Sequence, residues 1–420
     1  MRRRGFLALP LAPLAWPAAA HSELRQSIPA AGAVLDVTPQ RMELHFNERV
    51  QLTALRLRRV GGEEVALPRR PIREATSEVI ALPALPPGEY RAEWRIISAD
   101  GHPTGGGHPV SRRGAAQPMI LEYLQPDPSL IDGLTVLLRA LYYTTTIGTA
   151  GLALFALGFG HRLQADEAAR LRGLLLGGIV AGLSLSVAAL ALRVLVLTAG
   201  ASVTDGAVWA AVMRSRIGDA FWLRAGGLVL LGALLTSWRV APAVAAIGAA
   251  LVLGSYAAMG HSVLYRPRQE IAALVVAHLA VVAFWVGSLP PLLWIAGRRD
   301  GTATAALLRD WSAVATFAVG AMIATGLLLT WYLTLRLDRL FDAWHGWALV
   351  AKVLVVLSAL ALALWNRLRH TPALARGDDG AGLRLAASIR LEIAIVLVAF
   401  YAAAEMVSVH PADYGHRVQN

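Results

Sequence analysis

Eight separate runs of apolar residues, each about 20 residues long, dominate this chain of 420 residues. A helix of that length crosses a hydrocarbon core of roughly 30 Å. In lipid a helix satisfies its own backbone hydrogen bonds, which an irregular segment cannot do. We therefore expect an all-α bundle of about eight membrane-spanning helices. Their approximate bounds are 134–160, 173–199, 218–238, 240–259, 270–296, 310–335, 346–366 and 389–408.

The composition agrees with a membrane protein. Apolar residues make up 56% of the chain and charged residues only 16%, whereas an average soluble domain is about half apolar and a quarter charged. The net charge of +11 comes mainly from arginines at the ends of apolar runs, where they set topology, so no nucleic-acid partner is expected. Because the chain has no cysteine, a soft-metal site must use His, Met, carboxylate or backbone ligands.

The N-terminus has the pattern of a cleaved export signal. Arg2-Arg3-Arg4 precede a short apolar stretch that ends in Ala18-Ala19-Ala20. This arrangement is typical of a secretory signal peptide, here residues 1–20. The paired arginines fit a twin-arginine signal as well as a Sec signal, and both stay open. Cleavage there leaves His21 as the first mature residue, and its α-amine and ring nitrogen together favour Cu(II).

Residues 21–113 are expected to form a small β-domain. Short β-type runs at 41–46, 54–60, 78–82 and 90–97 are separated by turns rich in glycine and proline. Several short strands with regular turns favour a β-sandwich of about a hundred residues. The triplet Asp100-Gly101-His102 follows the last run directly, and its glycine allows a tight turn between two potential metal ligands.

Three stretches of this domain together resemble the CopC family of periplasmic copper-binding proteins. They are 21–33, which begins at His21, then 44–50, which contains Glu48, and 94–102, which ends in Asp100-Gly101-His102. The resemblance implies a Greek-key β-barrel or sandwich with a Cu(II) site. His21, Asp100 and His102 would be its ligands, with Glu48 as a further ligand or a supporting group. Met42 is the single methionine of 21–113, so no separate Cu(I) site is expected here.

The distribution of arginine predicts how the bundle lies in the membrane. With the β-domain in the periplasm, the segments facing the cytoplasm carry twelve arginines, and the outer segments carry seven. An excess of basic residues marks the cytoplasmic side. We therefore expect a multi-pass protein of the bacterial inner membrane, with a linker at 114–133, helices within 134–410 and a periplasmic tail at 411–420.

Several polar residues fall inside or at the ends of the apolar runs, where charges are costly and indicate function. Those predicted to lie in the outer half are Arg139, Arg193, Asp219, Arg224, His278, Lys352 and Glu405. Lys352 and Glu405 reach similar depths on consecutive helices and are predicted to pair. Met259, His261 and His278 offer thioether and imidazole ligands for Cu(I) or Cu(II). The alternative, a hydrogen-bonded packing histidine and a gap-filling methionine, stays open.

This half of the chain resembles the CopD family of copper-transport membrane proteins. The matching stretches are Met259-Gly260-His261-Ser262, His278-Leu279, Phe284-Trp285-Val286-Gly287, Thr325-Gly326, Lys352, Asn366-Arg367 and Arg390-Leu391-Glu392. A CopC domain followed by a CopD domain in one chain is a known fusion arrangement. The resemblance implies that copper passes through the helical bundle.

The sequence therefore predicts copper binding in the periplasm and copper transport across the inner membrane, with import as the leading interpretation, in copper homeostasis or resistance. Periplasmic copper proteins are candidate partners, and no catalytic residue is identified. Two alternatives stay open. A membrane haem or copper oxidoreductase would usually need paired axial histidines, and His278 alone lies deep within a run. A copper-delivery chaperone or sensor would need far fewer spans than eight.

Overall fold

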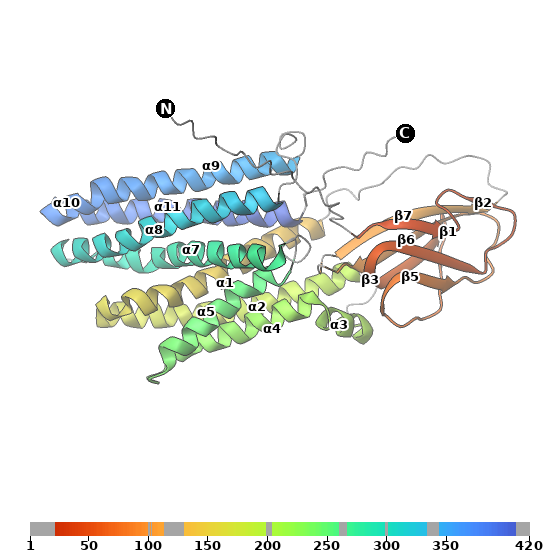
Figure 1. The fold of residues 1–420 in the computed structure, drawn as a ribbon, viewed down its shortest axis with the longest axis horizontal. Coiled ribbons are helices and arrows are strands. Elements are labelled where there is room, and N and C mark those ends of the chain that lie inside the picture. The colour runs from red at the N-terminus through yellow and green to blue at the C-terminus, as the bar shows by residue number, and fades with distance from the viewer. Residues whose placement is uncertain are drawn as a thin grey trace, which may run out of the picture.

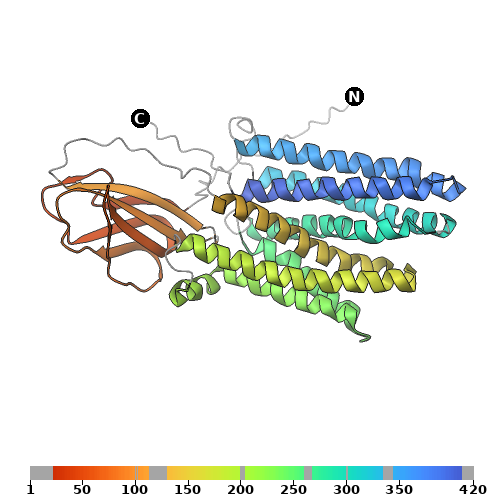
Figure 2. The same cartoon turned by 180° about the vertical axis from the view of Figure 1, so that it is seen from behind.

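The computed structural model describes residues 22–99, 101, 103–112, 130–198, 204–259, 267–298, 301–333 and 344–408. A β-domain lies against one end of a bundle of long helices, as both views show (Figures 1 and 2). We call this the β-domain end and the opposite one the far end. The expected order, an all-β domain followed by a helical membrane region, is confirmed.

Seven strands form the β-domain, and the third of them organises it. The strands are β1 (Leu24–Ile28), β2 (Val34–Leu35), β3 (Arg41–Arg59), β4 (Glu64–Val65), β5 (Glu74–Ala81), β6 (Glu89–Ile97) and β7 (Pro103–Arg112). The sheet runs β1-β3-β6-β7-β2, with β4 and β5 also paired to β3. The strands β1, β4, β5 and β6 each pair antiparallel with β3. Strand β2 pairs with β7, and these two run parallel to each other.

The runs 41–46 and 54–60, predicted as two strands, are one strand, β3, with an end at Arg59. Its pairing with β5 shifts register between His45 and Val50, and its pairing with β6 shifts between Leu52 and Ala54. Such irregularities bend a strand and change its partner without ending it. The first half of β3 therefore pairs with β1 and β5, and the second half with β4 and β6.

Alternating residues of β3 and β6 fill the core of the β-domain. Leu44, Leu52 and Ile96 are fully buried. Phe46 and Trp94 pack edge to face with their ring centroids 5.4 Å apart. This inward alternation is the period-two pattern of a strand with one face against a core.

The helices of the bundle match all eight predicted apolar runs. They are α1 (Leu130–Phe159), α2 (Ala165–Leu197), α4 (Arg216–Leu231), α5 (Ala241–Ala257), α7 (Arg268–Ile295), α8 (Gly301–Leu333), α9 (Trp344–Trp365) and α11 (Ala381–Ser408). Short elements join them: η1 (Gly160–Arg162), α3 (Gly206–Met213), η2 (Gly232–Leu235), the π-helix η4 (Asn366–His370) and α10 (Thr371–Arg376). Among the described residues seven helical segments are long and apolar enough to cross a membrane, one of them α4 continued by η2 (Arg216–Leu235), and α5, at 17 residues, is a shorter apolar helix.

The outside of the bundle is apolar, as expected of a surface in contact with lipid. Phe317 is 82% exposed and Leu327 is 68% exposed, both on α8. Exposed tryptophans occur towards both ends of the bundle, a distribution typical of membrane interfaces. They are Trp222, Trp238, Trp331, Trp347 and Trp365.

Helices α1 and α7 lie at the centre of the bundle and touch through glycine. α1 packs against α2, α4, α5, α7 and α11. A Cβ atom on Gly151 of α1 would lie 1.8 Å from the Ala283 carbonyl oxygen of α7, and one on Gly287 would lie 2.1 Å from the Gly151 carbonyl carbon. Only residues without a side chain permit this backbone contact, which is how small residues bring helices together in membranes.

An ion-pair network ties the far end of the bundle together. Glu167, in the first turn of α2, is buried and binds the guanidinium of Arg298, which follows α7. Glu167 also accepts from the Gln164 backbone N–H at 2.9 Å, which caps α2. Arg162 forms a second bridge to Asp310 of α8, at 2.5 Å. These contacts fix the order of α1, α2, α7 and α8 at this end.

The glycine contact predicts a large difference between two neighbouring substitutions on α1. Gly151→Ala places a methyl group inside the α7 backbone, so it should lower the thermal stability of the detergent-solubilised protein and separate α1 from α7. Gly148→Ala is the matched control, because a Cβ there meets no atom within 4 Å. It should leave stability unchanged or raise it by about 0.5–1 kcal/mol through helix propensity. Equal melting temperatures for the two variants would contradict the contact.

Candidate functional site

The first described residues of the β-domain are tied to Glu48. The Ser22 hydroxyl donates a hydrogen bond to the Glu48 carboxylate, and Ser22 is buried. The Glu23 backbone N–H donates to the Asn47 side-chain oxygen at 2.8 Å, and the Asn47 N–H returns a bond to the Glu23 carbonyl at 3.0 Å. His21, which directly precedes this anchored segment in the sequence, lies outside the described residues.

The turn that carries the Asp-x-His pair lies beside the same part of β3. Ile97, the last residue of β6, pairs with Gln51 of β3. Gly101 closes the turn through its N–H, which donates to the Ser98 carbonyl at 2.9 Å, and its φ of +82° is a conformation that favours glycine. Asp100 and His102 lie outside the described residues. Glu48 and this turn thus lie near each other along β3.

The same turn rests on the helical bundle. A Cβ on Gly101 would lie 3.3 Å from the Arg216 Cβ at the start of α4. Arg193 of α2 reaches the Gly101 carbonyl oxygen at 3.5 Å, and the Thr53 hydroxyl donates to the Leu197 carbonyl at 2.9 Å in a buried hydrogen bond. The predicted copper-binding turn is therefore held against the ends of α2 and α4.

An apolar cluster surrounds these polar contacts and joins the two parts of the protein. Its buried members come from β6, α2, α3 and α4: Ile97, Leu190, Val194, Leu197, Val208, Val212 and Ile217. Met213 and Met259 pack against it. Met259, a predicted copper ligand, thus lies beside the β-domain contact. His261 lies outside the described residues.

His278 lies on α7, which packs against α5 as the short connection between the two predicted. Its Nδ1 atom is 3.1 Å from the Thr325 hydroxyl of α8. That hydroxyl donates to the Ala321 carbonyl at 2.7 Å, so its oxygen accepts from the His278 Nδ1–H. This tautomer leaves the lone pair on Nε2. A fixed tautomer of this kind is how proteins orient a histidine that binds a metal.

The other predicted intramembrane charges have different surroundings. No ion pair joins Lys352 to Glu405 in the described part of the chain, although α9 and α11 pack together. Half-buried Lys352 instead interacts electrostatically with His278. Lys352 and Glu405 were expected to form an ion pair because they lie at similar depths in the bundle. Depth along a helix, however, does not fix the direction in which a side chain points.

Arg224 and Asp219 both lie on α4 but in contrasting positions. Arg224 is buried, and its guanidinium carbon lies 4.6 Å from the ring centroids of Tyr142 and Tyr256. These aromatic faces stabilise its charge through cation–π contacts. Asp219 is exposed in the first turn of α4, where a carboxylate interacts favourably with the helix dipole. Asp219 therefore lies outside the buried interior of the bundle.

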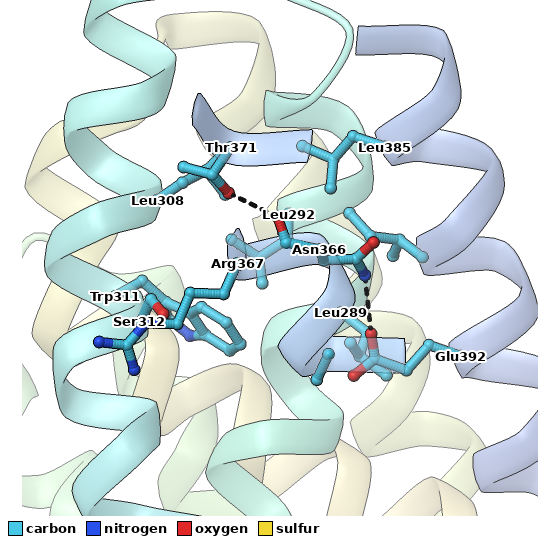
Figure 3. A pocket seen from close by; sticks show the side chains of 12 residues that line it. Leu289, Leu292, Leu308, Trp311, Ser312, Asn366, Arg367, Thr371, Leu385 and Glu392 are labelled. Atoms are coloured by element: carbon cyan, nitrogen blue, oxygen red, sulfur yellow. Dashed lines mark hydrogen bonds between the residues drawn. The ribbon is translucent and has the colours of Figure 1, made fainter. Parts of the chain in front are cut away.

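A second polar group towards the far end was not predicted as a site. The Glu392 carboxylate is buried and accepts from the Trp285 indole N–H at 2.7 Å and from the Asn366 amide at 3.4 Å. Glu392 and Asn366 border a small cavity between α7, α8, α9 and α11 (Figure 3). The sequence signal was present, since Glu392 is a carboxylate inside an apolar run.

Within the described residues no three His, Asp or Glu side chains gather closely enough to hold a metal ion. The predicted ligands that could complete such a set, His21, Asp100, His102 and His261, all lie outside those residues. The structure does place four described residues of the predicted copper sites and the segments around them: Glu48, Gly101, Met259 and His278.

Three protein families match successive parts of this chain. The CopC domain matches residues 24–110, the N-terminal domain of copper resistance protein D-like proteins matches 130–267, and copper resistance protein D matches 305–406.

Two curated proteins are similar over long stretches. "Copper transport protein CutJ" of Bacillus subtilis (strain 168) is 25% identical over 387 residues, which cover 84% of this chain and 69% of that protein. "Inner membrane protein YebZ" of Escherichia coli (strain K12) is 29% identical over 198 residues, or 45% of this chain and 67% of that protein. Among solved structures, PcoC, a methionine-rich copper resistance protein from Escherichia coli, is 31% identical and covers 22% of this chain and all of its own, with a TM-score of 0.20.

The contact between the Gly101 turn and α4 can be tested by a disulfide cross-link, because the chain has no cysteine of its own. A Gly101→Cys/Arg216→Cys double variant should form a disulfide on mild oxidation, since the two Cβ positions are 3.3 Å apart, close to disulfide geometry. Mass spectrometry of the digested, unreduced protein would identify the linked peptides.

The control is Gly32→Cys/Arg216→Cys. Gly32 also has a positive φ, but a Cβ there meets no atom within 4 Å, so both pairs carry similar backbone strain. A contact between the turn and α4 requires a cross-link at Gly101 and none at Gly32. Equal yields from the two pairs would contradict it.

Proposed function

Because this chain joins a CopC domain to a copper resistance protein D membrane domain, we propose that it captures Cu(II) outside the cell membrane and passes copper inward through its helical bundle. Copper handling and a multi-pass membrane location follow from those families. The inward direction, the ligands and the placement of the β-domain and C-terminus in the periplasm are our proposals.

In this proposal His21, Asp100 and His102 bind Cu(II), and Glu48 supports the site. The anchoring of Ser22 to Glu48 favours this set, because it brings the mature N-terminus to the part of β3 beside the Gly101 turn. Two imidazoles, a terminal amine and a carboxylate suit Cu(II) in a tetragonal arrangement. Glu48, already hydrogen-bonded by Ser22, then orients a neighbouring ligand.

The observation that carries the proposal is the contact between the Asp-x-His turn and the membrane helices. Gly101 packs on Arg216, and its carbonyl oxygen faces Arg193. A copper ion bound by the residues on either side of Gly101 would therefore be released directly at the bundle. Met259, at the edge of the same contact, offers a thioether on the membrane side.

From there copper passes to His278 by way of Met259 and His261. The Thr325 hydroxyl fixes the His278 tautomer, so that Nε2 is the atom that binds copper. Lys352, within electrostatic range, repels a cation at this position. Conduction requires that a site bind the ion tightly enough for the ion to enter and weakly enough for it to leave. We therefore propose transport rather than catalysis.

Copper uptake by cells that express matched amounts of each variant tests this function. Wild type should raise cell-associated copper, and His278→Ala should abolish the rise. His161→Ala is the control, since His161 lies exposed at the far end.

A His21→Ala/His102→Ala variant should transport only at high external copper, because capture is lost while the helical path remains. Unchanged or lower copper with wild type would exclude import, and a Soret absorption band in the purified protein would favour the haem alternative.

The role of Thr325 gives a finer prediction. Thr325→Val removes the acceptor for His278 Nδ1, so the apparent copper affinity of transport should weaken by about 10–100-fold. Thr330→Val is the control on the same helix, since its hydroxyl bonds only the Gly326 carbonyl among the contacts described. If both variants behave alike, the hydroxyl of Thr325 has no special role.

A further inference from the structure

The cavity at the far end contains an ionisable group that the copper path proposed above does not use. Its volume is about 40 Å³, and twelve residues line it (Figure 3). Apart from Glu392 and Arg367 they are uncharged: Leu289, Leu292, Leu308, Trp311, Ser312, Ala363, Asn366, Thr371, Leu385 and Ile389. A water molecule needs at least about 10–15 Å³ of such space, so the cavity has room for roughly two or three waters.

Both oxygens of Glu392 are held by uncharged donors. Trp285 donates to Oε1 at 2.7 Å, and Asn366 donates to Oε2 at 3.4 Å. Glu392 is 2% exposed and has no ion pair among the described residues. Burial disfavours a charged carboxylate, whereas hydrogen-bond donors favour it. A buried carboxyl group perturbed by its surroundings and bordering a cavity is a candidate functional group.

Two buried polar atoms beside the cavity lack a hydrogen-bond partner in the described part of the chain. They are the Asn366 side-chain oxygen and the Trp311 indole nitrogen. Asn366 is 8% exposed and begins the π-helix η4, a type of irregularity often found at functional sites. Buried polar atoms normally bind protein or water, so these two indicate that the cavity holds water.

The charged groups on the elements around Glu392 leave it without a fixed counter-ion. Arg367 borders the cavity, but its guanidinium donates to the Thr316 hydroxyl. On α9, Lys352 lies 14 residues before Asn366, which is about 21 Å along a helix. α1 has no charged residue between Leu141 and Phe159. The remaining charged or titratable groups near this end of α8, α9, α10 and α11 do not line the cavity: Arg309, Asp310, Arg369, His370, Arg376, Arg384 and Arg390.

A metal ion is a poor occupant for this cavity, because one carboxylate is its only strong ligand. A proton needs only that carboxylate and a water. We propose that Glu392 is a proton-exchanging counter-charge for copper: its carboxyl loses a proton as copper enters the inner half of the bundle and regains it when copper leaves. The O–H bond breaks, the proton passes to cavity water and the far-side solution, and Trp285 and Asn366 stabilise the carboxylate.

This proposal rests on the proposed copper transport, and α7 provides the link between the two sites. His278 and Trp285 are seven residues apart on α7, so they lie on one face of the helix, about 10 Å apart along its axis. Copper bound at His278 would therefore lie about two helical turns from the donor that holds Glu392. Ionisation of Glu392 then lowers the cost of moving a cation past this point.

Infrared spectroscopy of the full-length protein in lipid nanodiscs tests the proton site without transport. A pH titration should reveal a band of a protonated carboxylic acid that fades as pH rises. The band should be lost in Glu392→Gln and kept in Asp379→Asn, an exposed carboxylate at the same end of the bundle. In Trp285→Phe its midpoint should move to higher pH, because a donor to the carboxylate is gone. No titrating band, or the same band in Glu392→Gln, would overturn the proposal.

Copper transport into liposomes at varied internal pH tests the coupling. Wild type should transport Cu(II) faster as internal pH rises through the infrared midpoint, whereas Glu392→Gln should lose this dependence. Copper transport by wild type without dependence on internal pH would overturn the proton proposal and leave the proposed function intact. Absence of copper transport by wild type would refute the proposed function, while the infrared titration would still decide whether Glu392 exchanges a proton.

Discussion

Gly151 and Gly287 allow the backbones of α1 and α7 to touch, and the arrangement of the bundle depends on that contact. Lipid supplies no hydrophobic force between helices, so close packing has to hold them together. Because α1 also packs against α2, α5 and α11, its contact with α7 fixes the position of the whole second half of the chain relative to the first. It also fixes the rotation of α7, and with it the faces that carry His278 and Trp285.

The two polar groups on α7 lie against different neighbours. His278 meets Thr325 of α8 in the half of α7 nearer the β-domain, and Trp285 meets Glu392 of α11 farther in. Each interaction satisfies a buried polar group that would be costly in lipid. Together they place two polar interactions along α7, inside a bundle whose surface carries apolar residues such as Phe317. A cation that follows α7 would meet an imidazole first and a carboxylate second.

In the proposed function the β-domain supplies the Cu(II) ligands at the entrance to this route. Its contact with the bundle combines a buried hydrogen bond from Thr53 to α2 with apolar packing by Ile97. The contact includes Gly101, the residue between the two predicted Cu(II) ligands. Capture and membrane entry are therefore adjacent in the fold although they are far apart in the chain, which offers a physical reason for joining the two domains in one polypeptide.

The sequence by itself determined the elements of this protein, because apolar runs of membrane length and alternating β-type runs are local patterns. It also pointed to Glu48, Met259 and His278 by residue type and resemblance. Contacts between distant segments were decided only by the tertiary structure. Lys352 interacts electrostatically with His278, β3 continues where two strands were expected, and Glu392 accepts a hydrogen bond from Trp285 on another helix. Side-chain direction and helix rotation depend on packing, which no local pattern encodes.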